Sequence, residues 1–518
     1  MTNESLPALI TALSSRNSPL LAEPEQEPVK VISTHISWIL LTRQYAYKIK
    51  KSVNFGFVDF TTLEKRRFFC QEELRLNRRF AAALYLETIA IHGSPDAPTL
   101  EKTGNPIEYA VKLKRFEQGE LGLELAKKGL LTCELMEKLA STLAVFHDQA
   151  HQADNNSAYG TVATICADSE HNFSLLDSIC HPGIDRICAP IRQFERQEFE
   201  KLKPVLETRK SNGFIRECHG DLHLNNLVRF EGQLIPFDCI EFNESLRWID
   251  VINDIAFLCM DMEAHAQHTA LFQLLNRYLE LSGDYAGMEV FRYYCVYRAM
   301  VRAKIAHLNN PGAALEKEDN SDLYRYLATA ARFSTPDRPT LFITHGFSGS
   351  GKSWLTRRMA PELAAIRINS DVERKRLHGY AALENTKRVA GDGIYTHEAT
   401  ERTYTHLRDT TALLLRSGYS TIVDATFLLK RHRRLFAQLA DEVGVEFKIV
   451  DIDEPYEVIE SRIKMRMARN DDPSEADLSI LAHQKQYAEA LDDDEKLRIH
   501  DHKTTNRSDI HWSFSKMS

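Results

Sequence analysis

A glycine-rich segment in the last third of the chain has the residue types and spacing of a phosphate-binding loop. The segment reads Gly346-Phe347-Ser348-Gly349-Ser350-Gly351-Lys352-Ser353 and matches G-x-x-x-x-G-K-S without a gap. Glycines let consecutive backbone N–H groups turn toward phosphate oxygens, Lys352 can reach the outer phosphates of a nucleotide, and the Ser353 hydroxyl can bind Mg²⁺. A strand-like run precedes the segment and a helical pattern follows it, as this motif requires. The alternative is a glycine-rich turn without a ligand.

A carboxylate and a guanidinium follow further along. Asp371 and Arg374 would share one face of a helix that begins here, where they could bind and deprotonate a hydroxyl group. Together with the glycine-rich loop, this segment resembles the P-loop kinases that include polynucleotide kinases, zeta-type toxins and gluconate kinases, which carry a D-x-x-R pattern after the second strand. The resemblance implies that Asp371 is the general base and that Arg374 binds the acceptor. In the alternative, Ser370 or Asp371 is only a helix cap.

Two later segments could complete this site. The apolar run 421–423 ends in Asp424, where a Walker B carboxylate would hold Mg²⁺ through water. Arg462, Arg466 and Arg469 share one face of a predicted helix. In the P-loop kinases that the chain resembles, a closing lid supplies such arginines to the transferred phosphoryl group, although solvated surface arginines are the alternative. The motif indicates the phosphate donor but not the acceptor, because those families phosphorylate nucleic-acid ends, nucleotide sugars and small hydroxy acids.

A second constellation lies in the first half of the chain. In the segment 219–226, which reads H-G-D-L-H-L-N-N, Asp221 and Asn226 are spaced as in the kinase catalytic loop H-R-D-x-x-x-x-N, and Asp238 ends the next apolar run. This form resembles the aminoglycoside phosphotransferase family and its choline and fructosamine kinase relatives. The resemblance implies that Asp221 accepts the acceptor's proton while Asn226 and Asp238 hold Mg²⁺ on ATP. The alternative is a hydrogen-bonded loop brace without a metal.

An upstream lysine could contact the phosphates. Ala46, Lys48 and Lys50 alternate on one face of a predicted strand, much as Ala and Lys do in the kinase V-A-I-K strand. We predict that Lys48 binds phosphate and that Glu73, chosen over its neighbour Glu72, pairs with it; plain surface charge is the alternative. The chain lacks a G-x-G-x-x-G loop between residues 25 and 45, and the families it resembles also cover the phosphates without that motif.

Two other segments near this site leave alternatives open. Residues 108–112 read as a strand that is either the hinge between two lobes, where backbone groups would meet adenine, or a plain edge strand. Asp250 and Asp254 stand at helical spacing, so one of them could brace the catalytic loop, and a capping or solvated role is the alternative.

The elements that must position these residues form two groups. Short strands over residues 31–60, a helix over 63–80 and mostly helix over 120–150 and 240–330 predict an α+β protein-kinase-like domain. Apolar runs at 341–344, 421–424 and 447–452 alternate with helices, which predicts the parallel sheet of an α/β P-loop NTPase. Pro336 and Pro339 mark the boundary. We predict a kinase-like domain over 1–330, a linker over 331–340, a P-loop kinase domain over 341–500 and a tail over 501–518.

Composition limits the functional classes. The chain has 518 residues, 43% of them hydrophobic and 27% charged, which favours a globular protein of more than one domain. Its net charge of −8 argues against a protein that coats nucleic acid. The nine cysteines contain no C-x-x-C pair, so we expect reduced thiols. The absence of a signal peptide and of a long apolar stretch predicts a cytoplasmic protein with no membrane partner.

These observations favour a bifunctional enzyme that uses ATP and Mg²⁺. Each domain would transfer the γ-phosphate to a hydroxyl of a small molecule whose identity the sequence does not give. In one alternative, one domain binds ATP as a sensor without transferring phosphate. In another, the P-loop domain phosphorylates nucleic-acid ends, for which the basic run 430–434 is local support, although such runs are usually solvated helix faces. The oligomeric state is not predicted.

Overall fold

The chain divides into two compact units. The computed structural model describes residues 7–21, 29–56, 58–177, 182–309, 322–335, 337–381, 384, 394, 396–469 and 478–501. The first unit comprises Met1–Leu176 and Lys203–His265, and the second comprises Asp177–Leu202 and Ala266–Ser518. This division differs from a boundary near residue 330, because helix α8 (His268–Ser282) packs against elements that follow that boundary.

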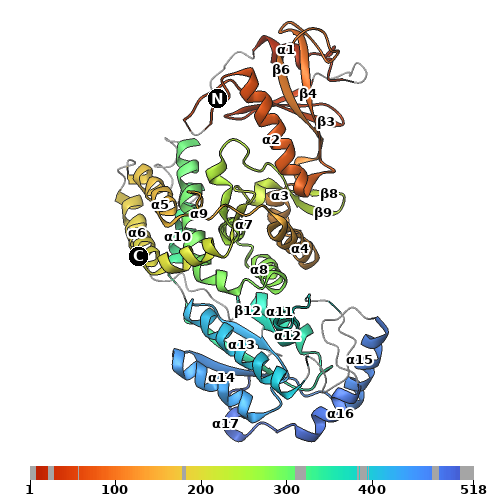
Figure 1. Ribbon diagram of the computed structural model, residues 1–518, viewed down its shortest axis with the longest axis vertical. Coiled ribbons are helices and arrows are strands. Elements are labelled where there is room, and N and C mark those ends of the chain that lie inside the picture. Colours follow the sequence, from red (N-terminus) through yellow and green to blue (C-terminus); the bar gives the residue numbers. More distant parts are fainter. Residues whose placement is uncertain are drawn as a thin grey trace. The chain divides into compact units, whose positions relative to one another are not determined.

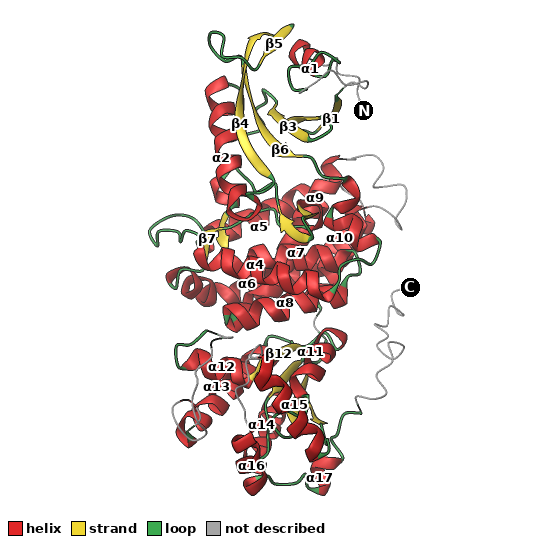
Figure 2. Ribbon diagram, turned by 90° about the vertical axis from the view of Figure 1, so that its right-hand side faces the viewer, coloured by secondary structure: helices red, strands yellow, loops and turns green. Residues whose placement is uncertain are grey.

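An antiparallel sheet opens the first unit (Figure 1). Its strand order is β1-β2-β3-β6-β4-β5. These strands are β1 (Lys30–Ser33), β2 (Ser37–Leu41), β3 (Tyr45–Lys50), β4 (Tyr85–Ser94), β5 (Ala97–Thr99) and β6 (Glu108–Lys114). Helix α2 (Leu63–Ala81) packs against β4 and β6 (Figure 2), while α1 (Ala8–Leu13) contacts β5. Because β6 pairs with both β3 and β4, the alternative that residues 108–112 form an edge strand is wrong.

Helices and two short strand pairs follow the sheet. In chain order the elements are α3 (Gly122–Lys127), α4 (Cys133–Gln149), α5 (Val162–Asp177), α6 (Pro182–Ser211), β7 (Ile215–Glu217), β8 (Leu227–Phe230), β9 (Gln233–Pro236), β10 (Trp248–Asp250) and α7 (Val251–Ala264). All of them belong to the first unit except the part of α6 up to Leu202 and the last residue of α5, which belong to the second. Strands β8 and β9 form an antiparallel hairpin in which Leu227 pairs with Pro236. The hairpin therefore returns the chain from Asn226 to the neighbourhood of Asp238, where the backbone N–H of Phe237 donates to the carbonyl of Asn226 at 2.9 Å.

A four-stranded parallel sheet organises the second unit, as predicted. Its order is β12-β13-β11-β14, with β11 (Thr340–His345), β12 (Ile366–Asn369), β13 (Thr421–Asp424) and β14 (Glu446–Asp451). The helices around it are α11 (Lys352–Glu362), α12 (Ser370–Leu377), α13 (His397–Arg416), α14 (Lys430–Val443), α15 (Tyr456–Arg469), α16 (Leu478–Tyr487) and α17 (Asp493–Lys496). Asn369 and Asp424 are register partners at the carboxyl ends of neighbouring strands, the edge where ligands bind in such sheets.

Besides the part of α6 up to Leu202, three α-helices precede this sheet in the second unit. They are α8, α9 (Met288–Asn309) and α10 (Asp322–Ser334). Helix α10 packs on α9 and continues to Ser334, so it extends into the predicted linker over 331–340, and β11 begins at the last residue of that linker. Helix α8 packs against α11 and β12. Within the part of the chain that the structure describes, no helix is long and apolar enough to cross a membrane, and the eight described cysteines are free thiols.

Candidate functional sites

Asp221 and Asn226 are hydrogen-bonded to each other in the loop between β7 and β8. The Nδ2 amide of Asn226 donates to Oδ2 of Asp221 at 2.8 Å and to its main-chain carbonyl at 2.9 Å. This directs the amide oxygen of Asn226 away from Asp221. On the other side, Nε2 of His223 lies 3.3 Å from Oδ2 of Asp221, while Nδ1 of His223 accepts the N–H of Asn225 at 3.2 Å, which places the ring proton on Nε2. The loop is therefore braced, and it also presents carboxylate and amide oxygens of the kind that Mg²⁺ binds.

Helix α7 holds this loop through two buried acids. Asp254 accepts the backbone N–H of His219 on Oδ2 at 3.1 Å and that of Gly220 on Oδ1 at 2.9 Å. Two helical turns later, Asp261 accepts the N–H of Leu224 at 2.9 Å. Burial opposes the charge of Asp254, but its hydrogen bonds and nearby histidines outweigh burial and lower its pKa.

The other predicted acid, Asp250, has the alternative role. Its side chain caps α7 by accepting the N–H of Ile252, and it forms a buried pair with Arg209 at 2.6 Å. Gly220 cannot be replaced without strain, since its φ is +86° and a Cβ atom there would lie 2.7 Å from the carbonyl oxygen of Leu246. Of the two roles predicted for this pair of acids, Asp254 thus braces the loop that carries Asp221, and Asp250 caps α7.

A buried chain of ion pairs surrounds the predicted lysine. Lys48 lies 2.9 Å from Oε1 of Glu73 and 2.5 Å from Oδ1 of Asp238. The other oxygen of Glu73 lies 2.8 Å from Lys50, which also pairs with Glu241. Burial would lower the pKa of Lys48, yet Asp238 and Glu73 raise it well above its ordinary value, so the lysine stays charged. The prediction of a Lys48–Glu73 pair is confirmed, and its alternative of plain surface charge is wrong.

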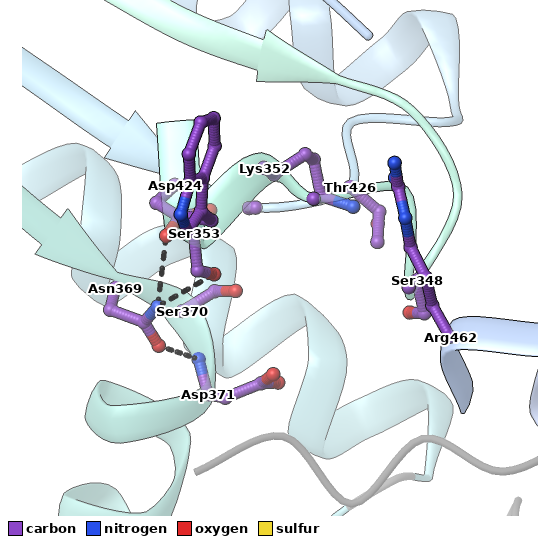
Figure 3. A pocket seen from close by; sticks show the side chains of 13 residues that line it. Ser348, Lys352, Ser353, Asn369, Ser370, Asp371, Asp424, Thr426 and Arg462 are labelled. Carbon is purple, nitrogen blue, oxygen red and sulfur yellow. Dashed lines mark hydrogen bonds between the residues drawn. The ribbon is translucent and has the colours of Figure 1, made fainter. Parts of the chain in front are cut away.

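In the second unit, the glycine-rich loop and the ends of β12 and β13 enclose a cavity of about 210 Å³ (Figure 3). The lining residues are Ser348, Gly349, Gly351, Lys352, Ser353, Trp354, Asn369, Ser370, Asp371, Asp424, Ala425, Thr426 and Arg462. Lys352 donates to the carbonyl oxygens of Gly346 and Phe347 at 3.0 and 2.6 Å, folding back along the loop. Gly346, Gly349 and Gly351 have positive φ, which fits the need for glycine in this turn.

Asp424 lies at the base of this cavity, held by three side chains. Oδ2 of Asp424 accepts from Nη2 of Arg367 at 2.5 Å, from Nδ2 of Asn369 at 3.0 Å and from Oγ1 of Thr356 at 3.1 Å. Burial would raise the pKa of Asp424, but Arg367 and Lys352 outweigh burial and lower it, with a further contribution from a hydrogen bond to Ser353. The carboxylate is therefore charged beside the serine hydroxyl, an oxygen donor set that fits Mg²⁺.

Asp371 and Arg374 stand three residues apart on helix α12, and the contacts of their side chains differ. Asp371 lines the cavity and its carboxylate extends away from Asn369 (Figure 3). The cap of α12 is Asn369, whose Oδ1 accepts the N–H groups of Asp371 and Val372, so the alternative that Ser370 or Asp371 is the cap is wrong. Arg374 is not among the lining residues. Its buried guanidinium instead donates to the carbonyl of Ile394 at 3.1 Å and to Thr400 at 3.2 Å.

Two residues from the region after β14 contact the loop itself. Arg462 lines the cavity, donates to the carbonyl of Ser350 at 2.9 Å and pairs with Glu454 at 3.1 Å. Gln484 accepts the N–H of Ser348 at 3.0 Å and donates to its hydroxyl at 2.8 Å. The side chains of Arg466 and Arg469, also predicted for the lid, lie outside the described residues.

Comparison with known protein families assigns both regions. Residues 70–291 match the family described as "Phosphotransferase enzyme family", and residues 341–491 match the family described as "AAA domain". The chain joins a phosphotransferase domain to a P-loop kinase domain. The predicted fold class is confirmed, and the protein is a phosphotransferase.

Similar proteins span most of the chain. Two uncharacterized proteins, one from Mycobacterium tuberculosis (strain H37Rv) and one from Mycobacterium bovis, are 29% identical over 462 residues, which cover 88% of this chain and 89% of each of those proteins. Among solved structures, a Plasmodium vivax ethanolamine kinase is 10% identical and covers 61% of this chain and 84% of its own, with a TM-score of 0.37. The Mycobacterium tuberculosis APS kinase in complex with AMPPNP and APS is 24% identical and covers 26% and 73%, with a TM-score of 0.21.

Several residues of the two domains were not predicted. In the phosphotransferase domain, Lys50 and Glu241 join the Lys48–Glu73 pair; the alternation of Lys48 with Lys50 gave a signal for the former, while Glu241 had none. In the P-loop kinase domain, Asn369 was signalled by its position before the D-x-x-R segment. Arg367 and Gln484 reach the site only through tertiary packing, which no local pattern announces.

Proposed function

We propose that the protein is a bifunctional enzyme in which each domain transfers the γ-phosphoryl group of ATP to a hydroxyl of its own small-molecule acceptor. The observation that supports the proposal is that each domain holds carboxylates, further oxygen groups of the kind that bind Mg²⁺ and a lysine at its candidate site. Such transfer depends on positioning and on neutralising phosphate charge, which these three parts supply.

In the phosphotransferase domain, Asp221 is the base. The acceptor oxygen attacks the γ-phosphorus as its proton passes to Asp221, and ADP leaves. The amide oxygen of Asn226 and the carboxylate of Asp238 would hold Mg²⁺, which neutralises phosphate charge when bound. Lys48, fixed by Glu73, binds phosphate oxygens; its present contact with Asp238 shows that its ammonium reaches this carboxylate.

In the P-loop kinase domain, Asp371 takes the role of base. The loop N–H groups, with Lys352, hold the phosphates, and Ser353 with Asp424 would hold Mg²⁺. Arg462 lies at the mouth of the loop, where it can stabilise the transferred group. Arg374 is buried away from the cavity lining, so we assign it to support of the segment around Thr400.

The basic run 430–434 gives the nucleic-acid-end alternative less support than its composition suggests, because two of its five side chains are buried. Arg433 is only 1% exposed and pairs with Glu495 at 2.8 Å, and His432 is buried against Glu401. Lys430 pairs with Asp492 and the half-exposed Arg431 pairs with Glu401, so most charges of the run already have a carboxylate partner. Small-molecule acceptors are therefore the better proposal for this domain.

The test compares wild type with Asp221→Asn and Lys352→Ala. ATP consumption and product formation are measured against a panel of sugars, aminoglycosides, nucleosides, small hydroxy acids and oligonucleotide ends. We expect each variant to lose one activity by about 100-fold or more while retaining the other, because each removes a transition-state interaction in one domain. Each variant thus serves as the control for the other.

Two outcomes would contradict the proposal. If both domains bind ATP but only one variant changes turnover, the other domain is a sensor. If either single variant abolishes both activities, the two reactions are not independent.

A further inference from the structure

A buried ion-pair chain leads from Asp424 to helix α8. Arg367, at 4% exposure, places Nη2 2.5 Å from Oδ2 of Asp424 and Nη1 3.2 Å from Oε2 of Glu280. Glu280 belongs to the segment 70–291 that matches the phosphotransferase family, although α8 lies in the same compact unit as the P-loop kinase domain. Glu280, which lies outside residues 341–491, therefore contacts the side chain that holds the cavity-lining Asp424.

The main chain around Arg367 is also held by residues of α8 and of the short helical turn that follows it. Its N–H donates to Oδ1 of Asn276 on α8 at 2.6 Å, and its carbonyl accepts from the hydroxyl of Tyr285 at 3.3 Å. Asn276 also donates to the carbonyl of Ala365 at 2.9 Å. These bonds fix the position of β12 on α8, so the guanidinium of Arg367 has little freedom to follow Asp424 alone.

The charges of Asp424, Arg367 and Glu280 affect how strongly the cavity attracts a cation. A buried guanidinium beside a single carboxylate would cancel the charge that Asp424 offers to a cation in the cavity. Glu280 supplies a second carboxylate that offsets part of the charge of Arg367, while Nη1 of Arg277 lies 3.6 Å from the other carboxylate oxygen of Glu280. The same contact keeps Arg367 turned so that it meets Oδ2 of Asp424. Outer partners of this kind orient ligands and tune metal affinity.

We propose that Glu280 is a positioning residue of the P-loop kinase site: through Arg367 it sets the orientation of Asp424 and the extent to which Arg367 offsets the charge of that carboxylate, and with them the affinity for Mg²⁺·ATP. This inference rests on the proposed role of Asp424 toward Mg²⁺. It makes a helix of the phosphotransferase-family segment part of the second nucleotide site.

The experiment measures binding of AMPPNP to the full chain by calorimetry over a series of Mg²⁺ concentrations, so that no turnover is needed. Binding that disappears in Lys352→Ala is assigned to the P-loop site. In Glu280→Gln we expect the Mg²⁺ midpoint of this site to rise about tenfold while the other site is unchanged. Glu442→Gln, which removes the same charge from a half-exposed pair with Arg408, is the control and should leave the midpoint in place.

Double variants separate this role from a merely structural one. Once Arg367→Met has removed the relay, adding Glu280→Gln should shift the midpoint no further, whereas additive shifts overturn the proposal. If Glu280→Gln alone does not fold, the Mg²⁺ midpoints of Arg367→Met and of the double variant are still compared, because the double variant removes both charges of the buried pair. An unchanged midpoint in Glu280→Gln, when Asp424→Asn does shift it, overturns the relay. An unchanged midpoint in Asp424→Asn instead removes the proposed role of Asp424, and the relay with it.

Discussion

The buried side chain of Lys50 links two segments that lie far apart in the sequence. Its side chain is fully buried between Glu73 on α2 and Glu241, which lies three residues after Asp238. Lys50 therefore ties the helix that orients Lys48 to the segment that carries the proposed Mg²⁺ ligand. Lys48 has a different environment, because its side chain is 12% exposed and its partner Asp238 is 42% exposed.

This difference predicts different effects for the two lysines. Lys50→Met should destabilise the phosphotransferase domain by about 3–5 kcal/mol, because it leaves the buried carboxylate of Glu241 without its lysine, whereas Glu73 keeps Lys48. Lys48→Met should abolish transfer by this domain with a smaller loss of stability, since Lys50 still pairs with Glu73. Urea unfolding and phosphoryl transfer by the two purified variants check the prediction. Equal unfolding free energies for Lys50→Met and wild type would show that the pair contributes no net stability.

At the scale of elements, α7 supports the loop that carries Asp221, the proposed base. Asp254 and Asp261 lie on one face of the helix and accept three backbone N–H groups from the loop. The loop has no regular structure around Asp221 itself, so these bonds fix the direction in which Asp221 points. A carboxylate on a rigid helix holds such a loop better than solvent could.

Asp254→Ala should therefore lower kcat of the phosphotransferase domain more than it raises KM for ATP. The change orphans the buried N–H groups of His219 and Gly220, at a cost of about 1–3 kcal/mol for each. Asp250→Ala is the control, since it removes the cap of α7 and the pair with Arg209 but no bond to the catalytic loop. Steady-state kinetics with the acceptor from the panel, together with thermal unfolding, separate the two roles. Equal losses of kcat in both variants would assign the effect to the stability of α7.

Elements that carry a strong local pattern were predictable from the sequence. The alternation around Lys48, the helix over α2 and the apolar runs of β11, β13 and β14 all appear close to the predicted bounds. Helix caps and the hydrogen-bond partners of buried side chains were not predictable in this way. Asn369 took the cap that Ser370 or Asp371 was expected to provide, because its amide oxygen reaches two N–H groups of α12 at once. The guanidinium of Arg374 donates to the carbonyl of Ile394 and to the hydroxyl of Thr400, contacts that the sequence did not predict.

At the scale of the whole molecule, the folding unit of the P-loop kinase domain is larger than its family match. The prolines near residue 336 suggested a boundary, and local composition carries no record of packing between α8 and β12. The contacts of Asn276, Glu280 and Tyr285 with β12 are made by residues far earlier in the chain. A boundary drawn from sequence therefore cuts through a set of buried hydrogen bonds and one buried ion pair.

A fragment over residues 340–501 should accordingly be less stable than the same domain within the full chain. Without α8, Arg367 loses its second carboxylate, and the edge strand β12 loses the partners of its main chain, each a buried group whose loss costs about 1–3 kcal/mol. Thermal loss of Mg²⁺·AMPPNP binding at the Lys352 site, followed in the fragment and in full-length protein, measures the difference. A fragment extended to residues 266–501 restores α8 and should recover part of it, whereas equal stability of the short fragment and the full chain would show that β12 folds without this helix.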